Sequence, residues 1–384
     1  MEIRIILSIW GKGFADVFVR WSLPSILTYR NYNEVISSGH KIKFYIYGDD
    51  KTLADIRKSE TVCALDNLSV LFFPISQTFF NGKPLDSDVK RQGIGIDTHE
   101  LQSRCYMHGM EQPVNGDVAF MFWTADFILS DGGLSWAISQ IESGCKAVYA
   151  DYIEISQERA TDELDICYSN LGKGASGREL ARIAIDHTHQ ITLDQFCDDG
   201  SISAYPPFIF LTGDKNSVVH TGIFPHPLLV VFDSKTTRFE SSIDYEFAQR
   251  VVGDMPYAKA LDSDDLLLCT VTPGIGYGPS KREKLTADFL ARFLITEANQ
   301  VHFELAQRIG IIHTSGIGSN SEEKRANVFG LFGEVRDKLI NIGNDIDLAE
   351  VYNLAAVKSF FGPCVLYASP QRQNINRRWL EGPE

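Results

Sequence analysis

The stretch Asp117–Gly132, DVAFMFWTADFILSDG, decides the fold class of this sequence. Residues 118–123 are all apolar, which is typical of a strand buried on both faces of a parallel sheet. An acid, Asp126, follows shortly afterwards, and a helical pattern begins near Gly132. Because open α/β sheets bind ligands at the carboxyl ends of their strands, this stretch predicts a parallel α/β fold with Asp126 at the ligand-binding edge.

Strand-like runs and helical patterns alternate on both sides of this stretch. Ile3–Ile9, Lys41–Tyr47 and Lys146–Tyr152 have the composition of strands. Phe14–Tyr29 has helical spacing, with Pro24 as a point where the helix bends or divides. The alternation predicts a doubly wound, mostly parallel sheet covered by helices on both faces. Further strands are expected at Leu68–Phe73, Phe208–Leu211, Leu228–Phe232 and Leu266–Val271, and further helices at 51–60, Thr98–Met110 and 132–143.

The pattern changes towards the C-terminus. Residues 284–310, 322–342 and 347–360 have helical spacing, and strand-like runs end near Val271. We therefore expect residues 1–280 to form the α/β domain that holds the ligand site. Residues 281–384 are expected to form a helical C-terminal region.

The composition excludes several classes of protein. The chain has 384 residues, of which 44% are hydrophobic and 22% charged, so it is long and apolar enough to bury a core and is not intrinsically disordered. Its 50 acidic and 36 basic side chains give a formal net charge of −14, which repels a phosphate backbone at long range. We therefore expect no nucleic-acid partner, although a local site or a metal still allows a small phosphorylated ligand to bind.

Cysteine usage and the apolar runs indicate the compartment. The seven cysteines are scattered and form no CxxC pair, which favours reduced thiols in the cytoplasm. Residues 1–9 are too short for a signal peptide, and the longest apolar runs are too short to span a membrane. Arg372, Arg377 and Arg378 are the one basic feature that an anionic membrane would attract. We therefore expect a cytoplasmic protein with at most peripheral contact with the inner membrane.

Asp126 is the first candidate for a functional residue. A carboxylate this close to a buried strand needs a partner, and a divalent cation is the simplest one. Asp131 stands where it is expected to cap the helix that follows. The turn Gly11-Lys12-Gly13 is similar to the start of a dinucleotide-binding loop, but Asp16 replaces the third glycine, so we interpret it as a plain turn. Asp49 is the acid at the end of the second strand.

His226 and Asp244 are the next candidates. His226 precedes an apolar strand, and Asp244 follows that strand with Glu246 close behind. His226, Asp126 and Asp244 together would offer the mixed nitrogen and oxygen ligands that Mn²⁺ or Mg²⁺ tolerates. A lone histidine beside a strand is also commonly a structural hydrogen-bond donor, so both roles stay open. We interpret the acidic run Asp262–Asp265 as a turn.

Several short segments occur in a familiar order: Ile9-Trp10-Gly11, residues 18–27, Tyr45-Ile46-Tyr47, residues 123–126, His226-Pro227-Leu228, residues 243–246 and residues 262–264. Together they resemble the bacterial GT-A-type glycosyltransferases of the nucleotide-diphospho-sugar transferase superfamily. The resemblance covers roughly residues 1–280. It implies a GT-A-like fold and transfer of a sugar from a nucleotide-sugar donor to a glycan or lipid-linked acceptor. The pathway it implies is the synthesis of a bacterial surface or capsular polysaccharide.

The resemblance also implies roles for individual residues at the donor site. Ser8, Ile9 and Trp10 fall where the family holds the nucleotide base, and Trp123 and Asp49 are expected at the same donor site. The DxD motif of the family, which holds a metal on the donor diphosphate, aligns with Thr124-Ala125-Asp126. Because Thr124 replaces the first acid, Asp126 is the carboxylate ligand that remains, and the need for Mn²⁺ or Mg²⁺ is left open.

The remaining implied roles concern the metal shell and the proton. A C-terminal histidine often completes the metal shell in GT-A enzymes, and His226 is the candidate. If the reaction inverts the anomeric centre, a carboxylate must take the proton of the acceptor hydroxyl, and Asp244 or Glu246 is expected to do so. If the reaction retains configuration, no such base is required. The sequence leaves the two outcomes open.

Two other functions compete with this one. Sugar nucleotidyltransferases share the sheet topology, but they usually carry a glycine-rich and basic loop after the first strand, where this chain has the single lysine Lys12. A non-catalytic module that binds a nucleotide-sugar or serves as a scaffold is favoured by the missing first acid at Thr124. Nucleotide binding, with or without a cation, and catalysis distinguish these alternatives.

Overall fold

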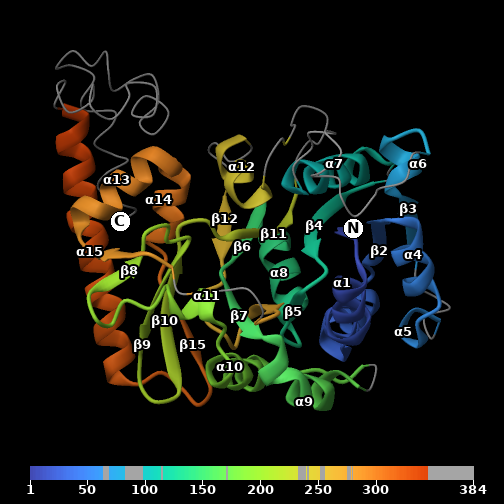
Figure 1. The fold of residues 1–384 in the computed structure, drawn as a ribbon, viewed down its shortest axis with the longest axis horizontal. Coiled ribbons are helices and arrows are strands. Elements are labelled where there is room, and N and C mark those ends of the chain that lie inside the picture. The colour runs from blue at the N-terminus through green and yellow to red at the C-terminus, as the bar shows by residue number, and fades with distance from the viewer. Residues whose placement is uncertain are drawn as a thin grey trace.

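The computed structural model describes residues 1–63, 69–82, 98–113, 116–169, 172–231, 239, 242–250, 256–274, 278 and 280–344. Its centre is a seven-stranded sheet (Figure 1). The strand order is β12 (Tyr257–Lys259), β6 (Ala147–Ala150), β11 (His226–Val230), β4 (Val118–Thr124), β1 (Glu2–Ile9), β2 (Lys41–Gly48) and β3 (Ser69–Pro74). β11 is antiparallel to β4 and β6, and the other neighbouring strands are parallel. The expected α/β class with a mostly parallel sheet is confirmed.

Helices cover both faces of this sheet. On one face, Ile6 of β1 shares an apolar core with Tyr106 of α7 (Thr98–Glu111). On the other face, Leu7 shares a core with Leu134 of α8 (Gly133–Glu142). Successive residues of a strand point to opposite faces, so the continuous apolar runs of β1 and β4 serve both cores. The helices α4 (Asp50–Arg57), α5 (Glu60–Cys63) and α6 (Ile75–Phe79) accompany β2 and β3.

Most of the helix predicted over Phe14–Tyr29 is present: residues 12–26 are continuously helical, a short turn follows, and residues 29–37 form a second helical run. Each run contains a π-helical turn, which is rare and usually single. Pro24 lies directly after the first π-helical turn, in the first turn of the α-helical part that follows, where proline is tolerated. The helical parts are α1 (Lys12–Val17), η1 (Phe18–Ser22), α2 (Leu23–Ile26), η2 (Tyr29–Asn33) and α3 (Glu34–Ser37).

The expectation that Asp131 caps α8 is wrong. The cap residue is Gly132, in a left-handed conformation with a φ of 99°, and no side chain at that position caps the helix. Instead, Asn31 of η2 accepts hydrogen bonds from the Gly132 and Leu134 amides at 2.9 and 3.0 Å. Asp131 accepts the Arg30 amide at 3.0 Å and so holds the same two segments together. Asn31, about a hundred positions earlier in the chain, therefore accepts the amides at the helix start in place of a neighbouring residue.

A small second sheet follows the ends of β4 and β6. Its order is β5 (Phe127–Leu129), β13 (Leu268–Thr272) and β7 (Tyr152–Ser156). The run predicted as the single strand Lys146–Tyr152 is thus divided at Asp151, and the chain passes from the central sheet into the small one. The helices α9 (Gln157–Tyr168), α10 (Gly177–Asp186) and α11 (Gln190–Leu193) come after β7.

The C-terminal region packs on further strands rather than standing apart. The strands β9 (Phe208–Thr212), β10 (Ser217–Gly222) and β15 (Gly310–His313) form one sheet, and β8 (Ser201–Ser203) pairs with β14 (Arg282–Lys284). The helices are α13 (Ala287–Glu297), α14 (Gln300–Ala306) and α15 (Ser319–Asn344), which share one core with residues 197–224. The stretch 284–310 therefore holds two helices and the start of a strand, and the expected helix at 347–360 lies outside the described residues.

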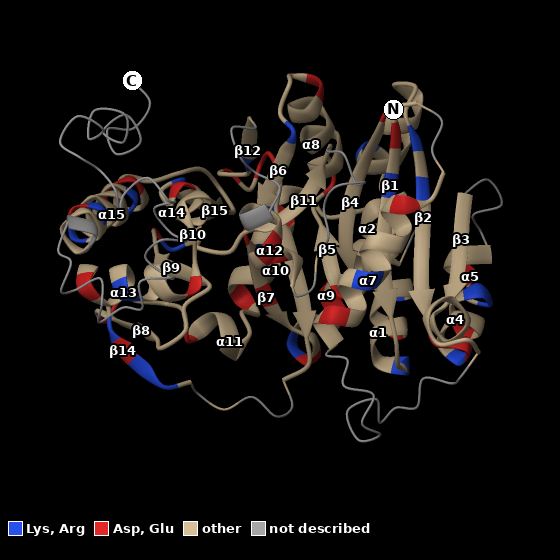
Figure 2. Ribbon diagram, turned by 90° about the horizontal axis from the view of Figure 1, so that it is seen from above, with Lys and Arg blue, Asp and Glu red and all other residues tan. Residues whose placement is uncertain are grey.

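Figure 2 shows acidic segments on β7 and α9 and mixed charges along α15. The cysteines in the described ranges are free thiols. None of the helices that the structure describes combines the length and the apolar character needed to cross a membrane.

Candidate active site

The carboxyl edge of the central sheet collects the polar residues that follow its strands. Trp10 follows β1, Asp49 follows β2, Asp126 follows β4 and Asp151 follows β6. Because β11 is antiparallel, it contributes its first residue, His226, to the same edge. Ligands of open α/β sheets bind at this edge, which makes these residues candidates for a binding site.

Asp126 lies in the turn between β4 and β5. Its backbone oxygen accepts the Val271 amide at 2.9 Å, which ties the turn to β13. Burial raises the pKa of its carboxyl group. Among the described residues, no lysine or arginine forms an ion pair with this carboxylate. A buried acid without a cationic partner carries a desolvation cost that a bound cation would relieve.

Glu154 is a second acid at this edge, and sequence reasoning missed it. It lies on β7, in register with Thr270 of β13, and Thr270 in turn pairs with Phe127, which follows Asp126. The Thr272 hydroxyl donates to its Oε2 atom at 2.9 Å. Burial, and to a smaller extent the charge of Asp126, raises the pKa of Glu154 to about 7. The Asp126 charge therefore reaches the Glu154 carboxyl group.

His226 and Asp244 form a pair beside these two acids. Asp244 lies in the first turn of α12 (Ile243–Arg250), and its Oδ1 atom is 2.6 Å from His226 Nδ1. The His226 Nε2 atom donates to the Phe122 carbonyl oxygen of β4 at 2.8 Å. The His226 ring also packs against Phe127, with ring centroids 4.8 Å apart. A role for His226 as a cation ligand would require one of these two hydrogen bonds to break.

Two tyrosines line the space between the three acids. Burial raises the pKa of Tyr152 well above its usual value, and Asp244, Glu154 and Asp126 add to the effect. Burial does the same for Tyr106, and Asp244 and Asp126 contribute again. The two phenols are therefore neutral hydroxyl groups near physiological pH, Tyr152 within the electrostatic reach of all three acids and Tyr106 within that of Asp244 and Asp126.

Unpaired hydroxyl groups mark the same edge. Ser8 of β1 and Thr124 of β4 are register partners on adjacent strands. Within the described ranges, the hydroxyl groups of Ser8 and Thr270 are buried without a hydrogen-bond partner, and the Thr124 hydroxyl lies beside the Asp126 carboxylate. Ser8 and Thr270 are each only 7% exposed. Buried polar groups are normally paired, so these hydroxyls are candidates for contacts with a ligand or with water.

The other predicted donor-site residues differ in how accessible they are. Ile9 and Trp123 are buried in the core, and Trp123 Nε1 donates to the Ser22 hydroxyl at 2.9 Å. Trp10 is half-buried on the α7 face of the sheet. Asp49 caps α4 through the Thr52 amide at 2.9 Å and lies 3.3 Å from the Gly11 amide. Burial opposes ionisation of Asp49, but these hydrogen bonds hold its pKa below the usual range.

Glu246 is less clearly part of the site than Asp244. It is buried on α12, with 8% exposure, two residues beyond Asp244. On a helix, residues two positions apart point in different directions. Of the two acids expected to act as a base, Asp244 is therefore the one that the His226 contact orients towards β4.

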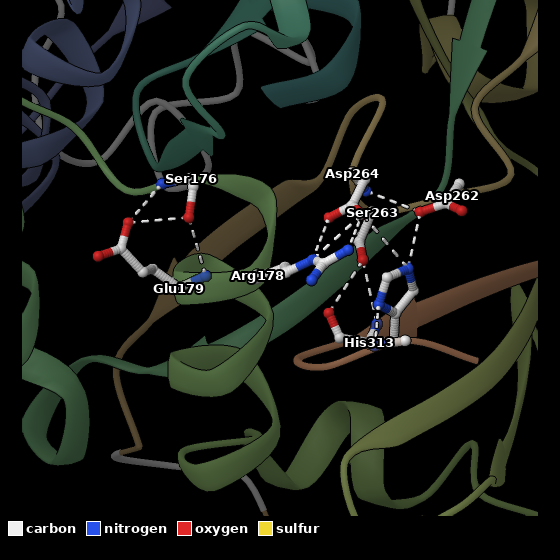
Figure 3. A network of polar contacts seen from close by, with 8 residues as sticks. Ser176, Arg178, Glu179, Asp262, Ser263, Asp264 and His313 are labelled. Carbon is white, nitrogen blue, oxygen red and sulfur yellow. Dashed lines mark hydrogen bonds and ion pairs between the residues drawn. The ribbon is translucent and has the colours of Figure 1, made fainter. Parts of the chain in front are cut away.

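A second group of acids that could hold a metal lies at residues 262–264. Ligand atoms of Asp262, Asp264 and His313 lie within 4.8 Å of one another. Figure 3 shows the Arg178 side chain directed at Asp264, and Arg178 Nη2 is 2.7 Å from its Oδ2 atom. His313 Nε2 is 2.9 Å from Asp262, and His313 Nδ1 accepts the Gly316 amide. Residues 262–265 form the predicted turn, and within it Arg178 already neutralises the Asp264 carboxylate.

The two acidic groups differ in how well they fit a cation. At residues 262–264, the proton on His313 Nε2 and the Arg178 guanidinium occupy the atoms that a metal would need. At the strand edge, Asp126 and Glu154 have no arginine or lysine ion pair among the described residues, and the Thr124 hydroxyl lies beside them. Carboxylate and hydroxyl oxygens suit Mg²⁺ or Mn²⁺, so the strand edge is the better fit.

Comparisons with known proteins give matches among solved structures but none among family models or curated proteins. A structure of an active-site mutant of LgtC matches with 11% identity and a TM-score of 0.24, covering 42% of this chain and 49% of that chain. A structure of the galactosyltransferase LgtC in complex with donor and acceptor sugar analogs matches with 10% identity and a TM-score of 0.23, covering 40% and 47%. The chain therefore matches about half the length of these two structures.

Proposed function

We propose that the protein is a glycosyltransferase that moves a sugar from a nucleotide-sugar donor to a hydroxyl group of a glycan or lipid-linked acceptor. The observation that carries the proposal is the gathering of Asp126, Glu154 and Asp244 at the carboxyl edge without a lysine or arginine ion pair among the described residues. An anionic site of this kind suits a cation and the positive charge that develops on the sugar in glycosyl transfer. The order of sequence segments supports the same reaction.

The donor is proposed to lie across the ends of β1 and β4. Ser8 and Thr124 offer hydroxyl groups on those two strands, and Trp10 offers an aromatic surface beside them. A nucleoside placed there would bring its diphosphate towards Asp126. This placement accounts for the buried Ser8 hydroxyl, which is otherwise without a partner in the described structure.

Asp126 and Glu154, with the Thr124 hydroxyl, are proposed to hold a divalent cation against the diphosphate. When bound, such a cation stabilises the negative charge that develops on the leaving nucleoside diphosphate. The protein's own part is to keep the two carboxylates fixed, through the Val271 amide on the Asp126 turn and the Thr272 hydroxyl on Glu154.

Asp244 is proposed to act as the base. Its carboxylate takes the proton of the acceptor hydroxyl while that oxygen bonds to the anomeric carbon. At the same time, the bond from this carbon to the phosphate oxygen breaks, and its electron pair leaves with the nucleoside diphosphate. A base on the face opposite the leaving group gives inversion of the anomeric configuration. The proposed setting is the synthesis of a surface polysaccharide at the cytoplasmic side of the inner membrane.

A turnover assay tests this function. Purified protein is incubated with Mn²⁺, a panel of nucleotide-sugars and candidate glycan acceptors, and released nucleotide is measured together with the anomer of the product by NMR. Asp126→Asn should lower transfer by about 10²–10³-fold, the scale for losing one electrostatic stabiliser. Asp131→Asn, whose side chain still accepts the Arg30 amide, should remain within threefold of wild type.

The same assay separates the competing functions. Release of pyrophosphate from a nucleoside triphosphate and a sugar phosphate would instead show a nucleotidyltransferase. Donor binding without release of nucleotide from any pair in the panel would support a non-catalytic module and overturn the proposal.

A further inference from the structure

His226 makes an unusual pair of contacts for a buried ring. Its side chain is 1% exposed and lies between two oxygen acceptors, Asp244 Oδ1 at 2.6 Å and the Phe122 carbonyl oxygen at 2.8 Å. Asp244 itself is 18% exposed, so one end of the contact lies in the core and the other reaches the site.

The sequence around His226 explains its position. Pro227, the next residue, has no N–H to donate to the neighbouring strand. The pairing of β11 with β6 shifts register between Pro227 and Leu229, and a bulge of this kind re-aims the side chains beside it. The paired positions of β11 and β4 are Leu229–Met121 and Val230–Phe120. The His226 ring then supplies a donor to the Phe122 carbonyl, two residues beyond Phe120 on β4.

The two acceptors fix the chemistry of the ring. A carbonyl oxygen and a carboxylate both accept hydrogen bonds, so both ring nitrogens of His226 must donate. A ring that donates from both nitrogens carries two protons and a positive charge, and it has no lone pair left for a metal. Its charge then neutralises the Asp244 carboxylate across a short contact.

We propose that His226 is a positioning residue for Asp244 and not a cation ligand. It fixes Oδ1 of Asp244 relative to β4, which leaves Oδ2 to take the proton of the acceptor hydroxyl. Among the described residues, Oδ2 has no hydrogen-bond partner. This inference rests on the proposed function for the role of Asp244, but the protonation of the ring does not depend on it.

Other titratable groups face the pair and define its surroundings. Tyr106 of α7, Tyr152 of β7 and Tyr245 of α12 are all affected by the charge of Asp244. His302 of α14 lies 3.4 Å from the Asp244 backbone oxygen, and burial lowers its pKa to about 4, so it stays neutral. Asp126 and Glu154 are the nearby acids. The positive charge nearest to the Asp244 carboxylate in the described structure is therefore that of His226.

The first experiment measures the ring itself. Protein labelled with ¹⁵N at histidine is studied by NMR at neutral pH without donor or cation, and the His226 signal is assigned by its loss in His226→Gln. We expect both ring nitrogens to be protonated. A singly protonated, neutral ring would overturn the inference, and this result is independent of whether the protein transfers a sugar.

The second experiment measures the pH dependence of transfer in His226→Gln. Removing a positive charge beside a carboxylate favours its protonated form, so the acidic limb of the kcat profile should move to higher pH. We expect kcat to fall by about 10- to 100-fold, less than the ~10²–10⁴-fold contributed by a base itself, with KM for the donor within about threefold. His187→Gln is the matched control, because His187 pairs with Glu163 at 2.9 Å on α9, outside the site.

A direct measure of cation binding separates the two roles of His226. Calorimetric titration of Mn²⁺ with nucleoside diphosphate present should give the same affinity for His226→Gln as for wild type. Weaker Mn²⁺ binding with an unshifted pH profile would show that His226 is a ligand and would overturn the inference. Circular dichroism and the melting temperature check that the variant is folded, and Asp244→Asn, which keeps the shape of the side chain, should remove the acidic limb.

Discussion

Glu154 and Asp126 show what burial does to a single carboxylate at the strand edge. Both lose water on one side, and the pKa of each is raised by burial. Neither has an arginine or lysine ion pair in the described structure, so the cost of ionisation remains until a cation or a proton neutralises it.

The raised pKa of Glu154 predicts a pH-dependent stability. A carboxyl group whose pKa rises from 4.5 unfolded to about 7 folded stabilises the fold below pH 4.5, and this contribution is lost as the pH rises through 7. Removing the charge by Glu154→Gln should therefore raise the free energy of unfolding at pH 8 in EDTA by at most about 3 kcal/mol, which is seen as a higher melting temperature. At pH 4.5 the melting temperature should change little.

Glu158→Gln is the control for this prediction, because the pKa of Glu158 is lowered in the folded protein whereas that of Glu154 is raised. Backbone amides, its own and that of Gly274, lower the pKa of the exposed Glu158 carboxyl. Its replacement should not stabilise the protein at pH 8. Equal melting temperatures for Glu154→Gln and wild type across pH 4.5–8 would contradict the assignment of Glu154.

The contrast between these residues shows what the sequence reveals at this scale. Asp126 was predictable because the apolar run that buries it is adjacent in the chain. Glu154 was not, since the alternation Tyr152-Ile153-Glu154-Ile155 is typical of a half-exposed strand with its acid in water. The pairing of β7 with β13, which the sequence does not indicate, brings the face of β7 that carries Glu154 to the site.

Whole elements are held in place by residues distant in sequence, and Asn31 is the clearest case. Its side-chain oxygen accepts the Gly132 and Leu134 amides at the start of α8. Its amide group donates to the Ser25 and Ser130 carbonyls, each at 2.9 Å. The side chain is fully buried, so the Gly132 and Leu134 amides depend on it for pairing, whereas the Ser130 carbonyl also accepts the Gly133 amide at 3.0 Å.

Asn31→Ala is expected to destabilise the protein by about 3 kcal/mol, measured as the free energy of unfolding in urea. The estimate combines a lost helix cap of about 1 kcal/mol with the cost of buried groups left unpaired, about 1–3 kcal/mol. Asp131→Asn, a few residues from the same helix start, should change stability by less than about 0.5 kcal/mol. A loss below 1 kcal/mol for Asn31→Ala would show that water replaces the side chain.

Elements were predicted best where their signal is local. The buried strands β1 and β4 and the helix α7 lie close to the expected ranges, because apolar runs and helical spacing mark them directly. The segment Phe14–Tyr29 was predicted as a helix and is helical to Ile26, but the π-helical turn in its middle, where Ser22 accepts from Trp123, was not predicted. The sequence of the segment itself does not indicate which distant residues it contacts.

At the scale of the whole molecule, Asp151 joins the central sheet to the C-terminal part. Its Oδ2 atom accepts from Lys259 of β12 and from His220 and the Gly222 amide of β10, each at 2.9 Å. Burial opposes ionisation of Asp151, but Lys259 and His220 hold its pKa below the usual range. Lys259 Nζ also donates to the Leu305 carbonyl oxygen of α14 at 3.1 Å, so these contacts connect the central sheet with β10 and α14.

Lys259→Met should therefore weaken the whole fold. Removing one partner of a buried ion pair typically costs about 3–5 kcal/mol, and we expect the low end because His220 and the Gly222 amide remain on Asp151. The double variant Lys259→Met/Asp151→Asn should be more stable than Lys259→Met, since no uncompensated charge is left. A double variant no more stable than the single one in urea would contradict this account of the junction.

The most direct test of the central claim is the binding of a nucleoside diphosphate at the carboxyl edge. Calorimetric titration of UDP, GDP, CDP, CMP or dTDP into the full chain should show binding of at least one nucleotide, strengthened by Mn²⁺. Asp126→Asn should bind the nucleotide without that strengthening, because the carboxylate nearest to the diphosphate has lost its charge. Failure of every nucleotide to bind wild-type protein at millimolar concentration, with or without Mn²⁺, would contradict the claim that this edge is a donor site.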